Sequence, residues 1–177
     1  MVQVLQLSLV DTNGQCEVIL AYTNVCAKQR GVGNLTMEIR EYKNFQLDEI
    51  VNFYRSVGWT NYLERINVLE QAYAGSLCVL GAYNSDQLVG IIRAVGDGQT
   101  IVFVQDIIVL PEYQRKGIGT KLLKALMDKY KDVYQMELLT DNTEKTKGFY
   151  RSLGFVESDE FGCVSFIRIN MDAQLKV

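Results

Sequence analysis

The most informative absence in this 177-residue sequence is histidine, which does not occur at all. Catalysis by Ser-His-Asp or Cys-His groups and metal sites with histidine ligands are therefore excluded. Proton transfer would have to come from Tyr, Asp, Glu, Lys or Cys side chains. The four cysteines are widely spaced and form no Cys-x-x-Cys pair, so the sequence also lacks a zinc or thioredoxin-type redox motif.

Two further absences concern partners. No stretch of about 18 apolar residues is present to span a bilayer, and the start lacks the basic and apolar segments of a signal peptide. The formal net charge of −3 argues against a general nucleic-acid binder, because such proteins usually carry a concentrated positive face. We therefore expect a cytoplasmic protein with free thiols that binds neither membrane nor nucleic acid.

What is present is an ordinary globular composition, with 48% hydrophobic and 22% charged residues. The length suits one domain with a sizeable core. Residues 1–36 differ from the rest, because their partial alternation and their turn at residues 11–14 suit either a hairpin or a leader. A regular pattern begins at Met37. We expect an N-terminal extension over residues 1–36, one domain over 37–170 and a tail over 171–177.

From residue 37 onward, apolar periodicity predicts alternating strands and helices. We expect strands over residues 37–43, 77–83, 88–95, 101–110, 133–139, 155–157 and 163–169. We expect helices over residues 48–57, 62–74, 118–130 and from 142 or 143 to 153. Antiparallel hairpins come first and a strand-helix-strand crossover follows, which indicates a mixed α+β fold.

The predicted strand over residues 101–110 leads into Pro111, the only proline, and then into a basic turn with two glycines. Glycine lets the backbone approach an anion, and the free N–H groups at the start of the next helix face the same point. Arg115 and Lys116 add positive charge there. The layout favours a pyrophosphate site, with a merely tight glycine turn as the alternative.

Two motifs resemble the GNAT acetyltransferase family. The first resembles its Q/R-x-x-G-x-G/A signature, and its residues are Gln114, Arg115, Lys116, Gly117, Ile118 and Gly119. The second resembles its F-Y-x-x-x-G-F element and runs from Phe149 to Phe155, at the distance usual in that family. The likeness covers about residues 37–170, and residues 53–59 are similar to the first-helix segment of small bacterial members and of plant serotonin-type ones. It implies the GNAT acyl-CoA N-acyltransferase fold, a mixed, mostly antiparallel sheet flanked by about four helices.

The resemblance implies an acyltransferase that moves the acetyl group of acetyl-CoA to a primary amine in a ternary complex, without a metal. The acceptor would be a small-molecule or peptide amine, and a homodimer is compatible with the family. The alternative from another class is a non-catalytic acyl-CoA-binding sensor or partner-binding module. A nucleotide P-loop is disfavoured, because Gly119 is followed by Thr120 and only then by Lys121.

The same likeness implies a set of coenzyme contacts. Those to the pyrophosphate would come from Gln114, Arg115, Lys116, Gly117, Ile118, Gly119 and Thr120. The backbone of Ile107, Ile108 and Val109 would pair with the two amides of pantetheine, as an added strand pairs with a sheet edge. Thr143 joins the set, because it stands seven residues ahead of the motif tyrosine, where the family often has an asparagine.

Tyr150 occupies the position of the family's general acid, which protonates the departing thiolate. A phenol suits this role because its reference pKa of about 10 keeps it protonated at neutral pH. The alternative is a core aromatic, although helix register indicates that Phe149 and Leu153 are the buried pair. No general base is evident, because the position twelve residues ahead of the tyrosine, a carboxylate in some members, is Leu138.

Gln105 and Asp106 interrupt an otherwise apolar strand, where a buried carboxylate is costly unless it is paired. Strict alternation would place Asp106 on one face with Val104 and Ile108. Asp106 could be a catalytic base or an amine anchor, or equally a structural acceptor for backbone N–H groups or for Arg93. Amine deprotonation through water would need no dedicated base.

Trp59 and Tyr62 lie in or beside the first two predicted helices, which in the family cover the substrate cleft. Aromatic side chains there suit an amine with an apolar or aromatic body, so we expect both residues to bind the acceptor. Ordinary packing is the alternative, and it is the favoured reading for Tyr73.

Overall fold

Five strands form a single sheet in the order β1-β2-β3-β4-β5 in this computed structural model, which describes residues 37–59 and 62–169. They are β1 (Met37–Glu41), β2 (Cys78–Asn84), β3 (Gln87–Gly96), β4 (Ile101–Val109) and β5 (Gln135–Leu138). Strands β1 to β4 pair antiparallel, and β5 joins β4 in parallel. The mixed, mostly antiparallel sheet predicted from the sequence is confirmed.

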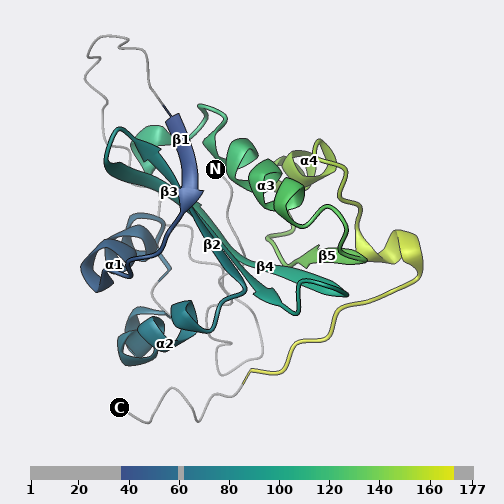
Figure 1. Ribbon diagram of the computed structural model, residues 1–177. Helices are drawn as coiled ribbons and strands as arrows, with labels where there is room; N and C mark the ends of the chain where they lie inside the picture. The colour runs from purple at the N-terminus through teal and green to yellow at the C-terminus, as the bar shows by residue number, and fades with distance from the viewer. Residues whose placement is uncertain (1–36, 60–61, 170–177) are drawn as a thin grey trace, which may run out of the picture.

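Helices cover both faces of the sheet (Figure 1). On one side lie α1 (Leu47–Ser56), the 3-10 helix η1 (Leu63–Val68) and α2 (Leu69–Ala74), and on the other lie α3 (Ile118–Lys129) and α4 (Glu144–Arg151). The short η2 (Pro111–Tyr113) and η3 (Ser158–Phe161) are also 3-10 helices. The predicted helix over residues 62–74 is broken, because Arg65 has a non-helical backbone with φ −127° and ψ 38°. None of the described helices is long and apolar enough to cross a membrane.

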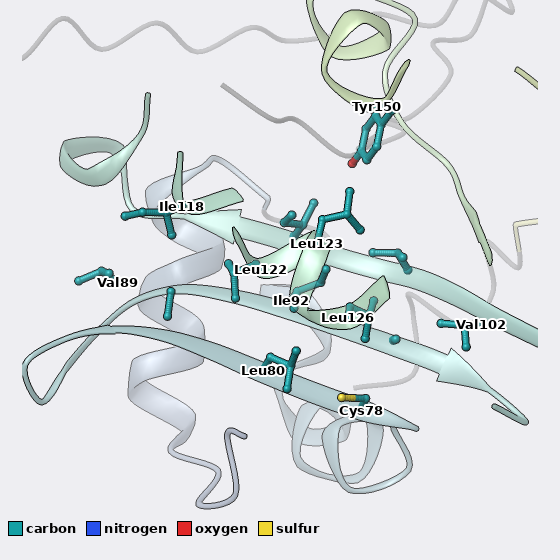
Figure 2. Packing of buried hydrophobic residues seen from close by; sticks show 14 residues of the cluster. Cys78, Leu80, Val89, Ile92, Val102, Ile118, Leu122, Leu123, Leu126 and Tyr150 are labelled. Carbon is teal, nitrogen blue, oxygen red and sulfur yellow. The ribbon is translucent and has the colours of Figure 1, made fainter. Parts of the chain in front are cut away.

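Each face of the sheet has its own hydrophobic core. Leu122, Leu123 and Leu126 of α3 pack onto the strands in one cluster, which Figure 2 shows with Leu80 and Ile92 beneath the helix. The other cluster joins α1, η1 and α2 to the opposite face, and its fully buried members include Ile50, Phe53, Tyr54, Ile91 and Ile108. Each fully buried side chain of this size contributes about 1.5–3 kcal/mol, so both helical layers are held mainly by burial.

The alternation of side chains between the two faces of the sheet is interrupted in the middle of β4. Its register with β3 skips Gln105 between Val104 and Asp106, which makes Gln105 a β-bulge. Val104 therefore packs in the α3 cluster, whereas Asp106 reaches Tyr54 of α1 and Ile108 packs in the α1 cluster. The expectation that Val104 and Asp106 share a face is wrong, because the extra residue reverses the alternation.

The chain after α4 departs from the sequence-based expectation. Residues 155–157 and 163–169 form no strands in the described structure, so both predictions are wrong. Residues 155–157 lead into η3 instead, and Gly162 then turns the chain with φ 70°. Residues 163–169 run clear of the sheet as the yellow segment of Figure 1. The predicted extension over residues 1–36 and the tail over 171–177 lie outside the described residues.

Candidate functional site

A cavity of about 390 Å³ opens where β4 ends and α3 begins. The residues that line it come from the end of β4, η2, the following turn, α3 and α4, and they are Val109, Tyr113, Gln114, Arg115, Gly117, Ile118, Gly119, Thr120, Lys145 and Phe149. Most residues predicted to contact the coenzyme pyrophosphate are among them. Arg115 and Lys145 bring two cationic side chains to the same cavity.

The turn before α3 has the backbone of an anion-binding site. Arg115 and Gly117 both lie in the left-handed region, with φ 63° and φ 76°. Gly117 is the N-cap of α3 and offers no side-chain cap, so the first N–H groups of the helix stay available at the cavity. A Cβ atom at Gly117 would meet nothing within 4 Å, so glycine serves the backbone conformation there and does not relieve crowding.

Four predicted coenzyme contacts do not line the cavity, and two of them, Ile107 and Ile108, lie farther along β4. Lys116 is exposed, with its Nζ 5.1 Å from the centre of the Tyr113 ring. Thr143 is the N-cap of α4, where its hydroxyl oxygen accepts from the Thr146 N–H at 3.3 Å and its proton goes to Asp141 at 2.8 Å. The structure therefore gives Thr143 a capping role that the family motif does not indicate.

Sequence reasoning misses three residues of the cavity wall, which are Tyr113, Lys145 and Phe149. Lys145 and Phe149 lie on α4 and reach the cavity because α4 faces the start of α3, a contact that no local pattern shows. Their separation of four residues, which places both on one face of a helix, is the one available signal.

Beyond Val104, β4 has a strand neighbour on one side only in the part of the chain that the structure describes. Strand β5 pairs with β4 as far as Val104, whereas Ile107, Ile108 and Val109 continue to pair with β3. The backbone groups of a strand point alternately to either side, so some of theirs face the free edge. The Val109 carbonyl accepts a hydrogen bond from the Gln114 side chain at 2.9 Å. The side chains of Ile107 and Ile108 are buried, so this edge offers backbone groups alone.

The Tyr150 side chain is only 4% exposed and points from α4 toward the sheet (Figure 2). Its hydroxyl has no hydrogen-bond partner at ordinary distance among the described residues, although the Thr140 side chain is near enough to lower its pKa. Burial is the larger effect and raises the pKa of the phenol above its usual value of 10.0. A buried hydroxyl without a partner costs about 1–3 kcal/mol, and such groups often mark functional positions.

Burial on α4 is the reverse of the predicted arrangement. Tyr150 is buried, whereas Phe149 and Leu153 are only partly buried. The register argument is wrong because Phe149 turns to the open cavity instead of the core. The Tyr150 ring is held edge-on by Phe149, with ring centres 5.0 Å apart, and by Phe155 at 5.9 Å.

Asp106 is fully buried and forms an ion pair with Arg93, with 2.5 Å between Nε and Oδ2. The Tyr54 hydroxyl donates to the same oxygen at 3.1 Å. Arg93 also donates to the Ser76 hydroxyl at 3.3 Å. Burial raises the pKa of the Asp106 carboxyl, and the Arg93 guanidinium opposes that shift. This arrangement fits the structural-acceptor reading of Asp106, while its second oxygen, Oδ1, has no partner among the described residues.

Trp59 and Tyr62 belong to an aromatic layer above this ion pair. Tyr54 stacks on both, with ring centres 4.8 Å from Tyr62 and 6.0 Å from Trp59. Trp59 is buried and its Nε1 has no described hydrogen-bond partner, whereas Tyr62 is half-buried and accepts from Gln105 Nε2 at 2.9 Å. Through the bulge, Gln105 and Asp106 thus both reach the aromatic layer.

Comparison with known proteins agrees with this geometry. Residues 75–157 match the family model of the acetyltransferase (GNAT) domain. A solved GNAT family acetyltransferase of Streptococcus pneumoniae is 44% identical with a TM-score of 0.69, and the match covers 77% of this chain and 99% of that one. The chain belongs to the GNAT family. Among curated relatives of this GNAT protein, an uncharacterized N-acetyltransferase of Gracilaria tenuistipitata is 23% identical, over 70% of this chain and 68% of its own length.

A second curated relative is the chloroplastic GCN5-related N-acetyltransferase 1 of Arabidopsis thaliana. It is 27% identical to this GNAT protein over 133 residues, which are 73% of this chain and 66% of the relative. GNAT enzymes use acetyl-CoA as the acyl donor and act on amines. Among the residues that the structure describes, no three His, Cys, Asp or Glu side chains group together as a metal site.

Proposed function

We propose that this GNAT protein transfers the acetyl group of acetyl-CoA to a primary amine by direct attack in a ternary complex. The cavity at the start of α3 carries the proposal, because free helical N–H groups, Arg115 and Lys145 meet there and suit a pyrophosphate. At the level of the fold, the PaiA N-acetyltransferase of Thermoplasma acidophilum was solved in complex with coenzyme A. It is 21% identical to this chain with a TM-score of 0.53, and the match covers 68% of this chain and 90% of that one.

From this cavity the pantetheine arm would follow the free edge of β4. Its two amides would pair with backbone groups of Ile107, Ile108 and Val109, as a strand adds to a sheet edge. A backbone N–H beside the thioester would then stabilise the oxyanion that forms when the amine attacks. The buried side chains of this stretch only exclude water.

The chemistry needs one acid when the carbon–sulfur bond breaks and the thiolate leaves. Tyr150 would supply that proton, because burial raises its pKa and its hydroxyl lacks an ordinary partner among the described residues. Asp106 is less suited to take the amine proton, since it is fully buried and tied to Arg93 and Tyr54. We assign it a positioning role, and the amine would lose its proton to water.

The acceptor would bind beside the aromatic layer. Tyr62 is half-buried at its edge and is fixed by Gln105, while Trp59 lies behind it. Flat apolar surfaces of this kind favour an amine with an apolar or aromatic body.

Substitution of Tyr150 by Phe tests the proposal. Thiol release from acetyl-CoA with a panel of amines should fall about 10²–10⁴-fold in kcat, with the acetyl-CoA KM unchanged. The free energy of unfolding should change by no more than about 1 kcal/mol, because the hydroxyl that is removed is buried and has only the Thr140 side chain near it among the described residues. The control is Tyr134→Phe, whose side chain is 85% exposed and should change neither quantity.

The alternative hypothesis, a module that binds acyl-CoA without catalysis, predicts a different result. Wild-type protein that binds acetyl-CoA in calorimetry but releases no thiol with any amine would favour the non-catalytic acyl-CoA-binding module.

A further inference from the structure

The cavity at the start of α3 receives positive charge from two different elements. Arg115 belongs to the turn before α3, and Lys145 belongs to α4. None of the described residues that line the cavity is acidic, and neither cation forms an ion pair with another described residue. The turn already offers Arg115 and free helical N–H groups to a pyrophosphate. Lys145 therefore remains for a further anionic group.

The position of Lys145 in α4 is not explained by the stability of that helix. Lys145 is the second residue of α4, where the positive end of the helix dipole disfavours a cation. The other two cations of the helix are paired. Lys147 lies 2.8 Å from Glu157, and Arg151 lies 3.5 Å from Glu144. Of the basic residues of α4, only Lys145 lines the cavity, and it does so without an acidic partner in the described chain.

The cavity also suits a group larger than a pyrophosphate. Its volume of about 390 Å³ lies in the range that holds a drug-sized ligand, so it has room for more than two phosphate groups. Tyr113 and Phe149 line it and are half-buried, so part of each aromatic side chain remains accessible. Aromatic rings of this kind stack on nucleobases. The cavity thus combines cations with an aromatic surface, which together suit a nucleotide.

Coenzyme A carries such a nucleotide, an adenosine with a phosphate on its 3′ hydroxyl, besides the pyrophosphate. We propose that Lys145 binds this 3′-phosphate, so that the protein distinguishes coenzyme A from the same molecule without that phosphate. The inference rests on the proposed function only in taking coenzyme A as the ligand. A phosphate monoester carries about −1.5 to −2 charge at neutral pH. A lysine ammonium binds such a group as a point charge, without the fixed geometry of a guanidinium.

Calorimetric titration of the full chain with coenzyme A and with 3′-dephospho-coenzyme A tests the proposal at low ionic strength, where charges are weakly screened. Wild type should bind the dephospho form about tenfold more weakly, because a hydrogen bond to a charged group is lost. Lys145→Met should bind coenzyme A about tenfold more weakly than wild type and the dephospho form equally well. Lys145→Arg should retain the discrimination. The Tm of Lys145→Met should not fall, because the helix dipole disfavours the cation that is removed.

Two further variants separate the two phosphate positions. Arg115→Met should weaken both ligands by the same factor, because both contain the pyrophosphate. Lys124→Met is the matched control and should change neither affinity, since Lys124 is exposed on α3 and does not line the cavity. Equal affinity of wild type for the two ligands, or equal loss of both in Lys145→Met, would overturn the proposal.

The same titrations distinguish this proposal from the proposed function. Wild type that binds neither ligand would overturn both. Discriminating binding without thiol release from acetyl-CoA with any amine would support the role of Lys145 and refute only the transfer reaction.

Discussion

The two sides of the candidate site are built in opposite ways. The proposed coenzyme side uses backbone groups, from the turn around Arg115 and Gly117 to the free edge of β4. The proposed acceptor side uses side chains, centred on the Arg93–Asp106 ion pair and the stacked aromatic rings of Tyr54 and Tyr62. A site built from backbone groups depends on chain conformation, whereas a site built from side chains depends on burial and charge pairing. Mutations should therefore impair the two sides by different mechanisms.

One strand serves both sides because of its bulge. The extra residue Gln105 brings two successive polar side chains of β4 to the aromatic layer. The pairing of β5 ends at Val104, next to the bulge, so the backbone edge becomes free at the same place. The bulge thus separates structural pairing on one end of β4 from the proposed binding functions on the other.

Loss of the buried cation should have the largest effect. Arg93→Met leaves the Asp106 carboxylate buried without its partner, and the free energy of unfolding should fall by about 3–5 kcal/mol in urea titrations. Addition of Asp106→Leu should recover most of the loss, since no charge then stays buried. A cost below about 1 kcal/mol for the single change would contradict the buried pair.

A smaller loss of stability is expected from a substitution in the glycine turn before α3. Gly117→Ala forces a side chain into the left-handed region, which costs about 1–2 kcal/mol, and the acetyl-CoA KM should rise about tenfold with the acceptor KM unchanged. Gly148→Ala is the matched control, because its Cβ also meets nothing within 4 Å but lies in helix α4. It should stabilise the protein by about 0.5–1 kcal/mol. Equal losses in both variants would contradict a conformational role for Gly117.

The hydrogen bond between Gln105 and Tyr62 should contribute less to the free energy of unfolding. Tyr62→Phe removes it and should cost about 0.5–1.5 kcal/mol while raising the acceptor KM and leaving the acetyl-CoA KM unchanged. A double-mutant cycle with Gln105→Met measures the coupling directly, with about 1 kcal/mol expected. Full additivity would show that the two side chains do not act together.

The smallest effect is expected from an exposed ion pair, the surface counterpart of Arg93–Asp106. Lys147, 2.8 Å away, and Arg151 hold the pKa of Glu157 below its usual value. Because the folded-state pKa is depressed, this stabilisation is present above the ordinary carboxyl pKa of about 4.3 and is lost as pH falls through the folded value. The Tm difference between wild type and Glu157→Gln, measured from pH 7 to pH 3, should therefore shrink at acid pH. A constant difference would exclude the charge effect.

The predictions that succeed rest on local signals. Apolar periodicity locates β1 to β4, α1, α3 and α4, and α4 has its N-cap at Thr143, where the predicted helix starts at residue 142 or 143. The failures include a break inside one helix and misjudged long-range contacts. A helix over residues 62–74 is interrupted at Arg65, and residues 163–169 lack a neighbouring strand in the described chain. Pairing with β3 also reverses the expected face of Asp106.

The amino-acid sequence by itself determined most of the helices and strands and the glycine turn before α3, because a glycine turn at a helix start needs only neighbouring residues to acquire its shape. Tertiary structure alone decided that Lys145 and Arg115 line one cavity, that Tyr150 is buried, and that Asp106 is paired with Arg93. Each of these depends on segments far apart in the chain packing together, and side-chain burial and charge pairing arise only from that packing.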